Sequence, residues 1–70
     1  MSEMLTNEEK SGLIEEHKKN LLFNLFNIEL TVIEEECKDT PDEEILSSLN
    51  LQISEINLKM SALDAELAKL

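Results

Sequence analysis

A regular spacing of apolar residues dominates the C-terminal part of the chain, from Ile45 to Leu70. These residues follow one another at alternating steps of three and four: Leu46, Leu49, Ile53, Ile56, Met60, Leu63, Leu67 and Leu70. The spacing places one apolar stripe along a single side of an α-helix and is the a/d pattern of a coiled coil. We therefore predict a long helix here, with its stripe packed against another helix.

The segment before this helix predicts a tight turn. Thr40 as N-cap, Pro41 at the first helical position and Glu43 three residues after Thr40 together match a capping box at a helix start. Because a residue before proline avoids helical geometry, any preceding helix must end before Thr40. We predict a turn over residues 38–40 and a helix over residues 41–69.

A second capping box marks an earlier helix, because Thr6 is followed three residues later by Glu9. We predict this helix over residues 7–37 and a frayed N-terminus over residues 1–6. One stripe of it is apolar, with Lys18 filling its one gap: Ile14, Leu21, Leu25, Ile28 and Val32. A three-residue loop between two long helices makes them antiparallel neighbours, so we expect an all-α, coiled-coil-like helical hairpin.

Both helices carry apolar residues that a hairpin leaves uncovered. On the first helix these are Leu22, Phe23, Phe26, Leu30 and Ile33, and on the second they are Leu51 and Leu58. A helix with one neighbour needs only one apolar side. We expect these seven residues to form a partner or oligomer interface. A two-fold homodimer making a four-helix bundle is the simplest solution, and a larger helical assembly is the other.

The chain is strongly acidic, with sixteen acidic and six basic residues and a formal net charge of −10. This charge disfavours direct binding to nucleic acid or to an anionic membrane, since both require clusters of Lys and Arg. It suits a protein partner with a basic patch. Seven carboxylates gather around the turn as a candidate acidic docking tip: Glu34, Glu35, Glu36, Asp39, Asp42, Glu43 and Glu44.

The acidic tip has a simpler interpretation as a solvated end that maintains solubility. Asp42, Glu43 and Glu44 have a structural reason to be there, because carboxylates stabilise the positive end of a helix dipole. Residues 34–36 stand at the negative end of the first helix, where we find no structural reason for them.

Three single residues have ordinary structural interpretations. We expect His17 to face solvent and Cys37 to be a buried small hydrophobe. Glu29 lies between the apolar stripe of the first helix that runs from Ile14 to Val32 and a second one, which consists of Leu22, Phe26 and Ile33 and is widened by Phe23, Leu30 and Cys37. Its side chain either extends to solvent or makes a buried polar contact that fixes the register of an assembly.

No sequence motif indicates catalysis, a cofactor or a metal ion. A phosphate-binding loop, a nucleophile–base set and the Glu-x-x-His pattern of di-metal bundles are all missing. We find neither a signal peptide nor an apolar run of about 20 residues that would span a bilayer, so we expect a cytoplasmic location.

The sequence therefore favours a non-enzymatic interaction module: a small, acidic, self-associating scaffold, adaptor or regulatory protein. The alternative is an acidic inhibitor, of the size and charge often met in phage-encoded proteins, that blocks a basic or nucleic-acid-binding site on a target protein. A third interpretation, a coiled-coil subunit of a hetero-oligomer, differs from the first only in which chain covers the second apolar side.

Overall fold

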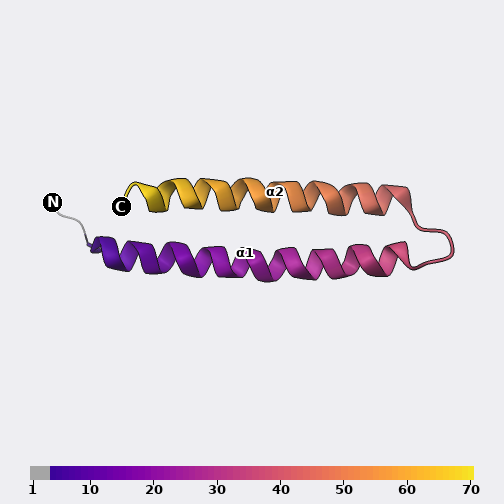
Figure 1. Cartoon of the computed structure of the whole chain (residues 1–70), viewed down its shortest axis with the longest axis horizontal. Helices are drawn as coiled ribbons and strands as arrows, with labels where there is room; N and C mark the ends of the chain where they lie inside the picture. Colours follow the sequence, from indigo (N-terminus) through magenta and orange to yellow (C-terminus); the bar gives the residue numbers. More distant parts are fainter. Residues whose placement is uncertain (1–3) are drawn as a thin grey trace.

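The computed structural model describes residues 4–70, which form two antiparallel helices, α1 (Asn7–Glu36) and α2 (Glu43–Ala68). The helices lie side by side along their whole length (Figure 1), in a rod measuring 59 × 17 × 15 Å. The prediction of an all-α hairpin is confirmed. Of the segment predicted to be frayed, residues 1–3 lie outside the described residues, and Met4 is exposed ahead of α1.

The start of α1 is fixed by the predicted capping box. The backbone N–H of Glu9 donates to Thr6 Oγ1 at 3.1 Å, and the backbone N–H of Thr6 donates to Glu9 Oε1 at 2.9 Å. Two amides that no helical carbonyl can reach are thereby satisfied. The prediction that a helix begins at Asn7 is confirmed.

The start of α2 differs from the prediction. Its N-cap is Asp42, whose Oδ1 accepts from the backbone N–H groups of Glu44 at 2.9 Å and Ile45 at 3.3 Å. The assignment of Thr40 as N-cap with Pro41 inside the helix was wrong. A carboxylate at position 42 binds two free amides, so α2 begins two residues later than expected, and the connection runs over residues 37–42.

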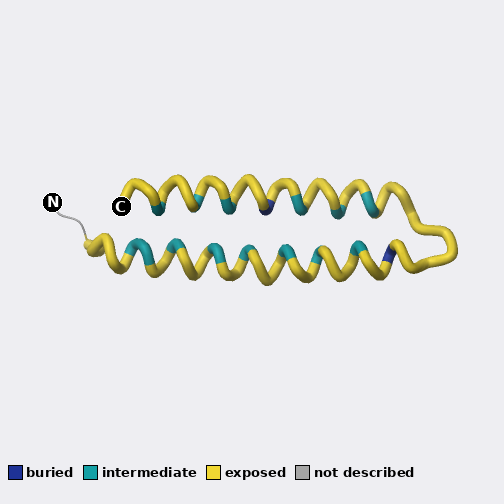
Figure 2. Tube along the Cα trace, viewed as in Figure 1, coloured by how far each residue is buried: buried dark blue, intermediate teal, exposed yellow. Residues whose placement is uncertain are grey.

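The core is a single layer of side chains between the two helices. Figure 2 shows the buried and half-buried positions on the facing sides of α1 and α2. They include the predicted α2 stripe from Leu46 to Leu67 and the predicted α1 stripe from Ile14 to Val32; Leu70, at the end of the stripe, is 43% exposed. Within residues 4–70, Ile56 is the one buried apolar side chain, with 7% of its surface exposed. A core this thin leaves much apolar surface in solvent.

Candidate protein interaction surfaces

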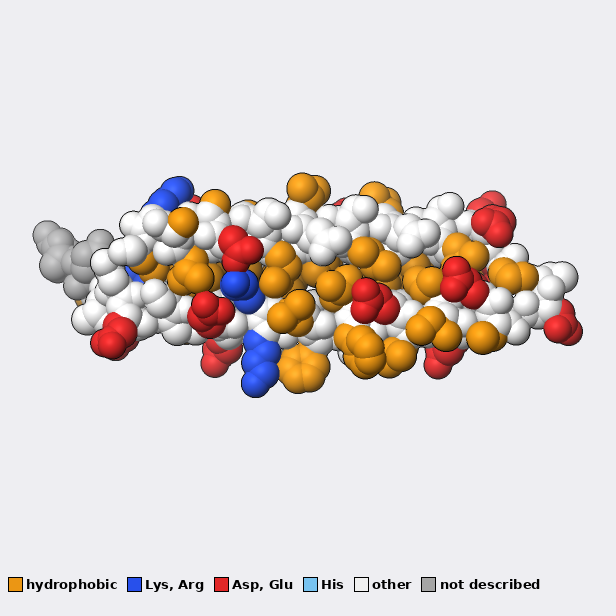
Figure 3. Space-filling model, viewed as in Figure 1, with side chains coloured by type: hydrophobic (Ala, Val, Ile, Leu, Met, Phe, Trp, Pro, Cys, Tyr) orange, Lys and Arg blue, Asp and Glu red, His pale blue; other side chains and the backbone are white. Residues whose placement is uncertain are grey.

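The uncovered apolar residues of α1 form one continuous surface, which we call the α1 outer face: Leu22, Phe23, Phe26, Leu30 and Ile33. Each of these side chains is between 41% and 61% exposed. In Figure 3 apolar side chains gather along the edge of α1 that faces away from α2. Single exposed apolar residues are ordinary, but a contiguous group of this size is typical of an interaction site.

The α1 outer face is the second apolar stripe of α1, and four of its residues have the spacing of a coiled coil. Phe23, Phe26, Leu30 and Ile33 are spaced by three, four and three residues, and Lys19 and Cys37 continue the pattern by four at either end. At about 100° per residue this stripe points about 140° away from the stripe that packs on α2. The regular three- and four-residue spacing is the sequence signal that identifies this stripe. It indicates that another helix can pack along the face.

A shallow apolar depression of about 260 Å³ lies at one end of the α1 outer face. Leu22, Phe23 and Phe26 line it together with Lys19. The methylene groups of a lysine can cover apolar surface while its ammonium group stays in water. The depression is therefore lined almost entirely by apolar surface, with the one charged group of its lining, that of Lys19, beside it.

The uncovered leucines of α2 lie elsewhere on the rod. Leu51 is 62% exposed and Leu58 is 71% exposed, and both point about 180° away from the helix–helix contact. Figure 3 shows apolar side chains at both outer edges of the molecule, one edge for each helix. The seven residues predicted to share an interface therefore divide into two surfaces, the α1 outer face and an isolated pair on the back of α2.

The side of α2 next to the α1 outer face is polar. Lys18 and Asp64 form an ion pair between the helices at 2.6 Å, which places them on the same side of the hairpin. Leu22 follows Lys18 by one helical turn, so it lies on that side too. The corresponding positions of α2, at steps of seven before Asp64, are Asn57 and Asn50. Among residues 4–70, the exposed large apolar side chains on this side are thus those of α1.

The acidic turn is partly a structural element. Glu35 is only 6% exposed, and its carboxylate accepts from Lys38 Nζ at 2.8 Å and from the backbone N–H of Asp42 at 2.9 Å. The hydrogen bond from Lys38, followed by that from Asp42, lowers the pKa of the Glu35 carboxyl below its ordinary value. The interpretation that residues 34–36 lack a structural role was therefore wrong for Glu35.

The rest of the predicted docking tip is exposed. Since Glu35 and Asp42 hold the turn together, the side chains left to meet a partner are Glu34, Glu36, Asp39, Glu43 and Glu44, all of which are exposed. Lys38, the cation in this segment, donates to Glu35, which raises the pKa of the Lys38 ammonium group. The tip therefore presents a negatively charged surface, because Lys38 is already paired with Glu35.

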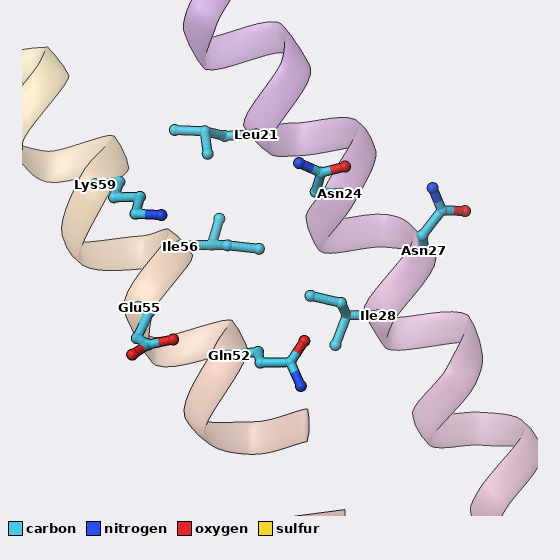
Figure 4. Close-up of a pocket in the computed structure, with 8 residues that line it drawn as sticks. All are labelled: Leu21, Asn24, Asn27, Ile28, Gln52, Glu55, Ile56 and Lys59. Atoms are coloured by element: carbon cyan, nitrogen blue, oxygen red, sulfur yellow. The ribbon is translucent and has the colours of Figure 1, made fainter. Parts of the chain in front are cut away.

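The opposite side of the hairpin carries a shallow open groove of about 410 Å³ with a polar rim. In Figure 4 the aliphatic side chains of Leu21, Ile28 and Ile56 point between the helices, and carboxamide and charged groups stand along both rims. The rim consists of Asn24, Asn27, Gln52, Glu55 and Lys59. This mixture marks a solvated flank of the core, in contrast with the apolar flank of α1.

The three single residues examined in the sequence have clear positions. His17 is exposed, as predicted, and Glu29 is exposed, which agrees with the interpretation that it extends to solvent. The prediction for Cys37 was wrong, because its free thiol is exposed. Cys37 is the C-cap of α1, and it continues the stripe of Phe23, Phe26, Leu30 and Ile33, which points away from α2. Among residues 4–70 no three His, Cys, Asp or Glu side chains come together as metal ligands.

Comparisons with known protein families, curated proteins and solved structures found no match to this chain. Along the described part of the chain, neither helix combines the length and the apolar character needed to cross a bilayer.

Proposed function

We propose that this chain is a non-enzymatic protein–protein interaction module that self-associates as a dimer through the α1 outer face. The observation that carries the proposal is the exposure of five neighbouring large apolar side chains on α1, two of them phenylalanines about 60% exposed. Aromatic residues in such surfaces contribute a large share of the binding free energy in protein interfaces. As a scaffold or adaptor, the module would need no cofactor, and its single thiol is in keeping with a cytoplasmic location.

The size of the α1 outer face supports a homodimer. Two phenylalanines exposed to this extent each offer about 100 Å² of apolar surface, and the five side chains together offer on the order of 500 Å². Two copies would then bury roughly 1,000 Å², the lower limit for a specific interface. Burial of this face would also give each hairpin the second packed layer that a stable domain requires.

The polar side of α2 favours a dimer in which the two α1 helices are central. A closed four-helix bundle would require apolar residues on both helices of one side of the hairpin. On α2 that side carries Asn50, Asn57 and Asp64. The arrangement that buries the apolar surface and leaves these groups in water is an open layer with the order α2, α1, α1, α2. Leu51 and Leu58 then remain free on its outer edges.

Sedimentation equilibrium at micromolar concentration tests the proposal. We expect a dimer, and we expect Phe26→Ser to weaken it at least tenfold, because a large aromatic group would be lost from the centre of the contact. Leu58→Ser is the matched control: it also replaces an exposed apolar residue by serine on a helix, and it should leave the dimer unchanged. A monodisperse monomer with a cooperative thermal transition would overturn the proposal.

A second candidate function rests on the acidic turn. Five exposed carboxylates at one end of the rod would suit an inhibitor that occupies a basic or nucleic-acid-binding site on a target protein. In that case, replacing Glu34 and Glu36 by Lys should abolish capture of the target from a host extract and leave the mass of the module unchanged. Equal capture by the variant and the wild type would exclude this function.

A further inference from the structure

We infer that the two copies pair with their α1 helices antiparallel, so that Phe26 of one copy packs on Leu30 of the other and Phe23 packs on Ile33. The inference rests on the proposed function, because it assigns a geometry to the self-association proposed for the α1 outer face. It follows from the residues of the second α1 stripe, from their spacing and from the distribution of charge along the hairpin.

The stripe is self-complementary in the antiparallel direction. In antiparallel coiled coils each a position faces a d position of the other helix, and here Phe23 and Leu30 occupy a positions while Phe26 and Ile33 occupy d positions. Each contact among these four residues then places an aromatic ring against an aliphatic side chain. A parallel pair would instead place each phenylalanine against its own copy, and each aliphatic residue against its own copy, with a wide contact at one end and a narrow one at the other.

The length of the stripe fits the same arrangement. It runs from Lys19 to Cys37, and its midpoint is at residue 28. A two-fold axis passing beside this midpoint superposes the entire stripe of one copy on the entire stripe of the other, over about 27 Å of helix. The polar N-terminal turns of α1, including Glu15 and Glu16, then lie beyond the contact.

The charges also favour the antiparallel pair. Lys19 of one copy comes level with Cys37 of the other, beside the Glu36 carboxylate, and symmetry makes this ion pair twice. The two acidic turns lie at opposite ends of the contact, farther apart than the Debye length of about 8 Å at physiological salt. A parallel pair would bring both acidic turns together and place Lys19 against its own copy.

The native thiol of Cys37 allows the relative direction of the two α1 helices to be measured by cross-linking. In the antiparallel pair the two Cys37 residues lie about 27 Å apart along the axis, whereas position 19 of one copy faces Cys37 of the other. We therefore expect a short bis-maleimide reagent to leave the wild-type dimer uncross-linked and to convert Lys19→Cys efficiently into a covalent dimer. The matched control, Lys19→Cys with Cys37→Ser, should remain uncross-linked because its two thiols are again about 27 Å apart.

A second cysteine pair leaves the apolar stripe and Lys19 intact. In a Cys37→Ser background, Asn20→Cys and Glu34→Cys flank the stripe at positions that face each other in an antiparallel pair. The double variant should cross-link and each single variant should not. This pair also decides the direction if Lys19→Cys weakens the dimer.

Sedimentation of the same samples separates the inference from the proposed function. A wild-type dimer that cross-links through Cys37 alone is parallel and overturns the antiparallel geometry, while the self-association itself stands. A dimer in which neither designed pair cross-links also overturns this geometry. A wild-type monomer would overturn the self-association and the geometry together.

Discussion

Lys18 Nζ lies 2.6 Å from Asp64 Oδ1 and joins α1 to α2 across the core. Lys18 occupies a position in the apolar stripe of α1 that a coiled coil would normally fill with an aliphatic residue. Its side chain is 20% exposed, so most of its methylene chain is covered while its charge reaches Asp64 at the edge. Because the partner is on the other helix, this pair resists sliding of one helix along the other by a turn.

We expect Asp64→Asn to lower the midpoint of thermal unfolding by a few degrees at neutral pH, since it removes the charge that faces Lys18. The hydrogen bond with Asp64 raises the pKa of Lys18 above its ordinary value of 10.5. The ion pair therefore stabilises the fold fully below pH 10.5 and loses its effect as the pH rises through the raised pKa. Thermal melts followed by circular dichroism between pH 8 and 12 should show the two proteins converging at high pH. A constant difference across this range would contradict the assignment.

The turn provides a prediction in the opposite pH direction. Glu35→Ala removes the acceptor of both Lys38 and the Asp42 amide, so it should lower the unfolding midpoint more than Glu35→Gln, whose amide oxygen can still accept from Asp42. Because the pKa of Glu35 is lowered from its ordinary value of 4.5, this stabilisation is complete above pH 4.5 and is lost as the pH falls through the lowered pKa. Melts between pH 2 and 7 measure the effect.

Glu34→Ala is the control for this experiment. Glu34 is the exposed neighbour of Glu35 on the same turn of α1. A surface substitution of this kind should change the stability little at neutral pH. If Glu34→Ala and Glu35→Ala behaved alike, the fold would not depend on the contacts of Glu35 at the turn.

The centre of the core gives a prediction of larger magnitude. Ile56 is 7% exposed, so Ile56→Ala should reduce the free energy of unfolding by about 2–4 kcal/mol, through lost burial and an incompletely filled cavity. Leu58→Ala, two residues away and 71% exposed, should cost no more than about 0.5 kcal/mol. Urea denaturation measures the stability of both variants. The protein concentration must be the same in each experiment, because self-association would stabilise the folded state to an extent that depends on concentration. Similar losses for the two variants would mean that the helix face is assigned wrongly.

The sequence predicted those parts of the structure that depend on local signals. The Thr6–Glu9 capping box and the stripe from Leu46 to Leu67 are recognised from spacing alone, and both are present in the hairpin. The start of α2 was not predictable in this way, since Thr40 and Asp42 both suit an N-cap. The structure has Asp42 as the N-cap, with its amide held by the buried carboxylate of Glu35, seven residues earlier in the chain.

The extent of the candidate surfaces could not be predicted from the residue directions on each helix alone. The spacing of residues shows that Leu22 points away from the core stripe of α1 and that Leu58 points away from the core stripe of α2. Which residues of α2 lie beside Leu22 depends on how the two helices are rotated about each other, and the ion pair between Lys18 and Asp64 fixes this rotation. That rotation places polar residues of α2 beside the α1 outer face, so the apolar surface available to a partner is carried by one helix.

The sign of the salt dependence separates self-association from binding to a basic partner. Each copy carries a formal net charge of −10, so pairing two copies brings like charges together. We expect the dimer to become several-fold tighter between about 0.05 and 0.5 M NaCl, because salt screens this repulsion while the apolar contact remains. Glu29→Gln should strengthen the dimer at low salt, since the two Glu29 residues flank the axis in the antiparallel pair. Sedimentation equilibrium across the salt series measures both effects. A complex of the acidic turn with a basic protein would weaken over the same range, and a dimer that dissociated with added salt would contradict an apolar interface on α1.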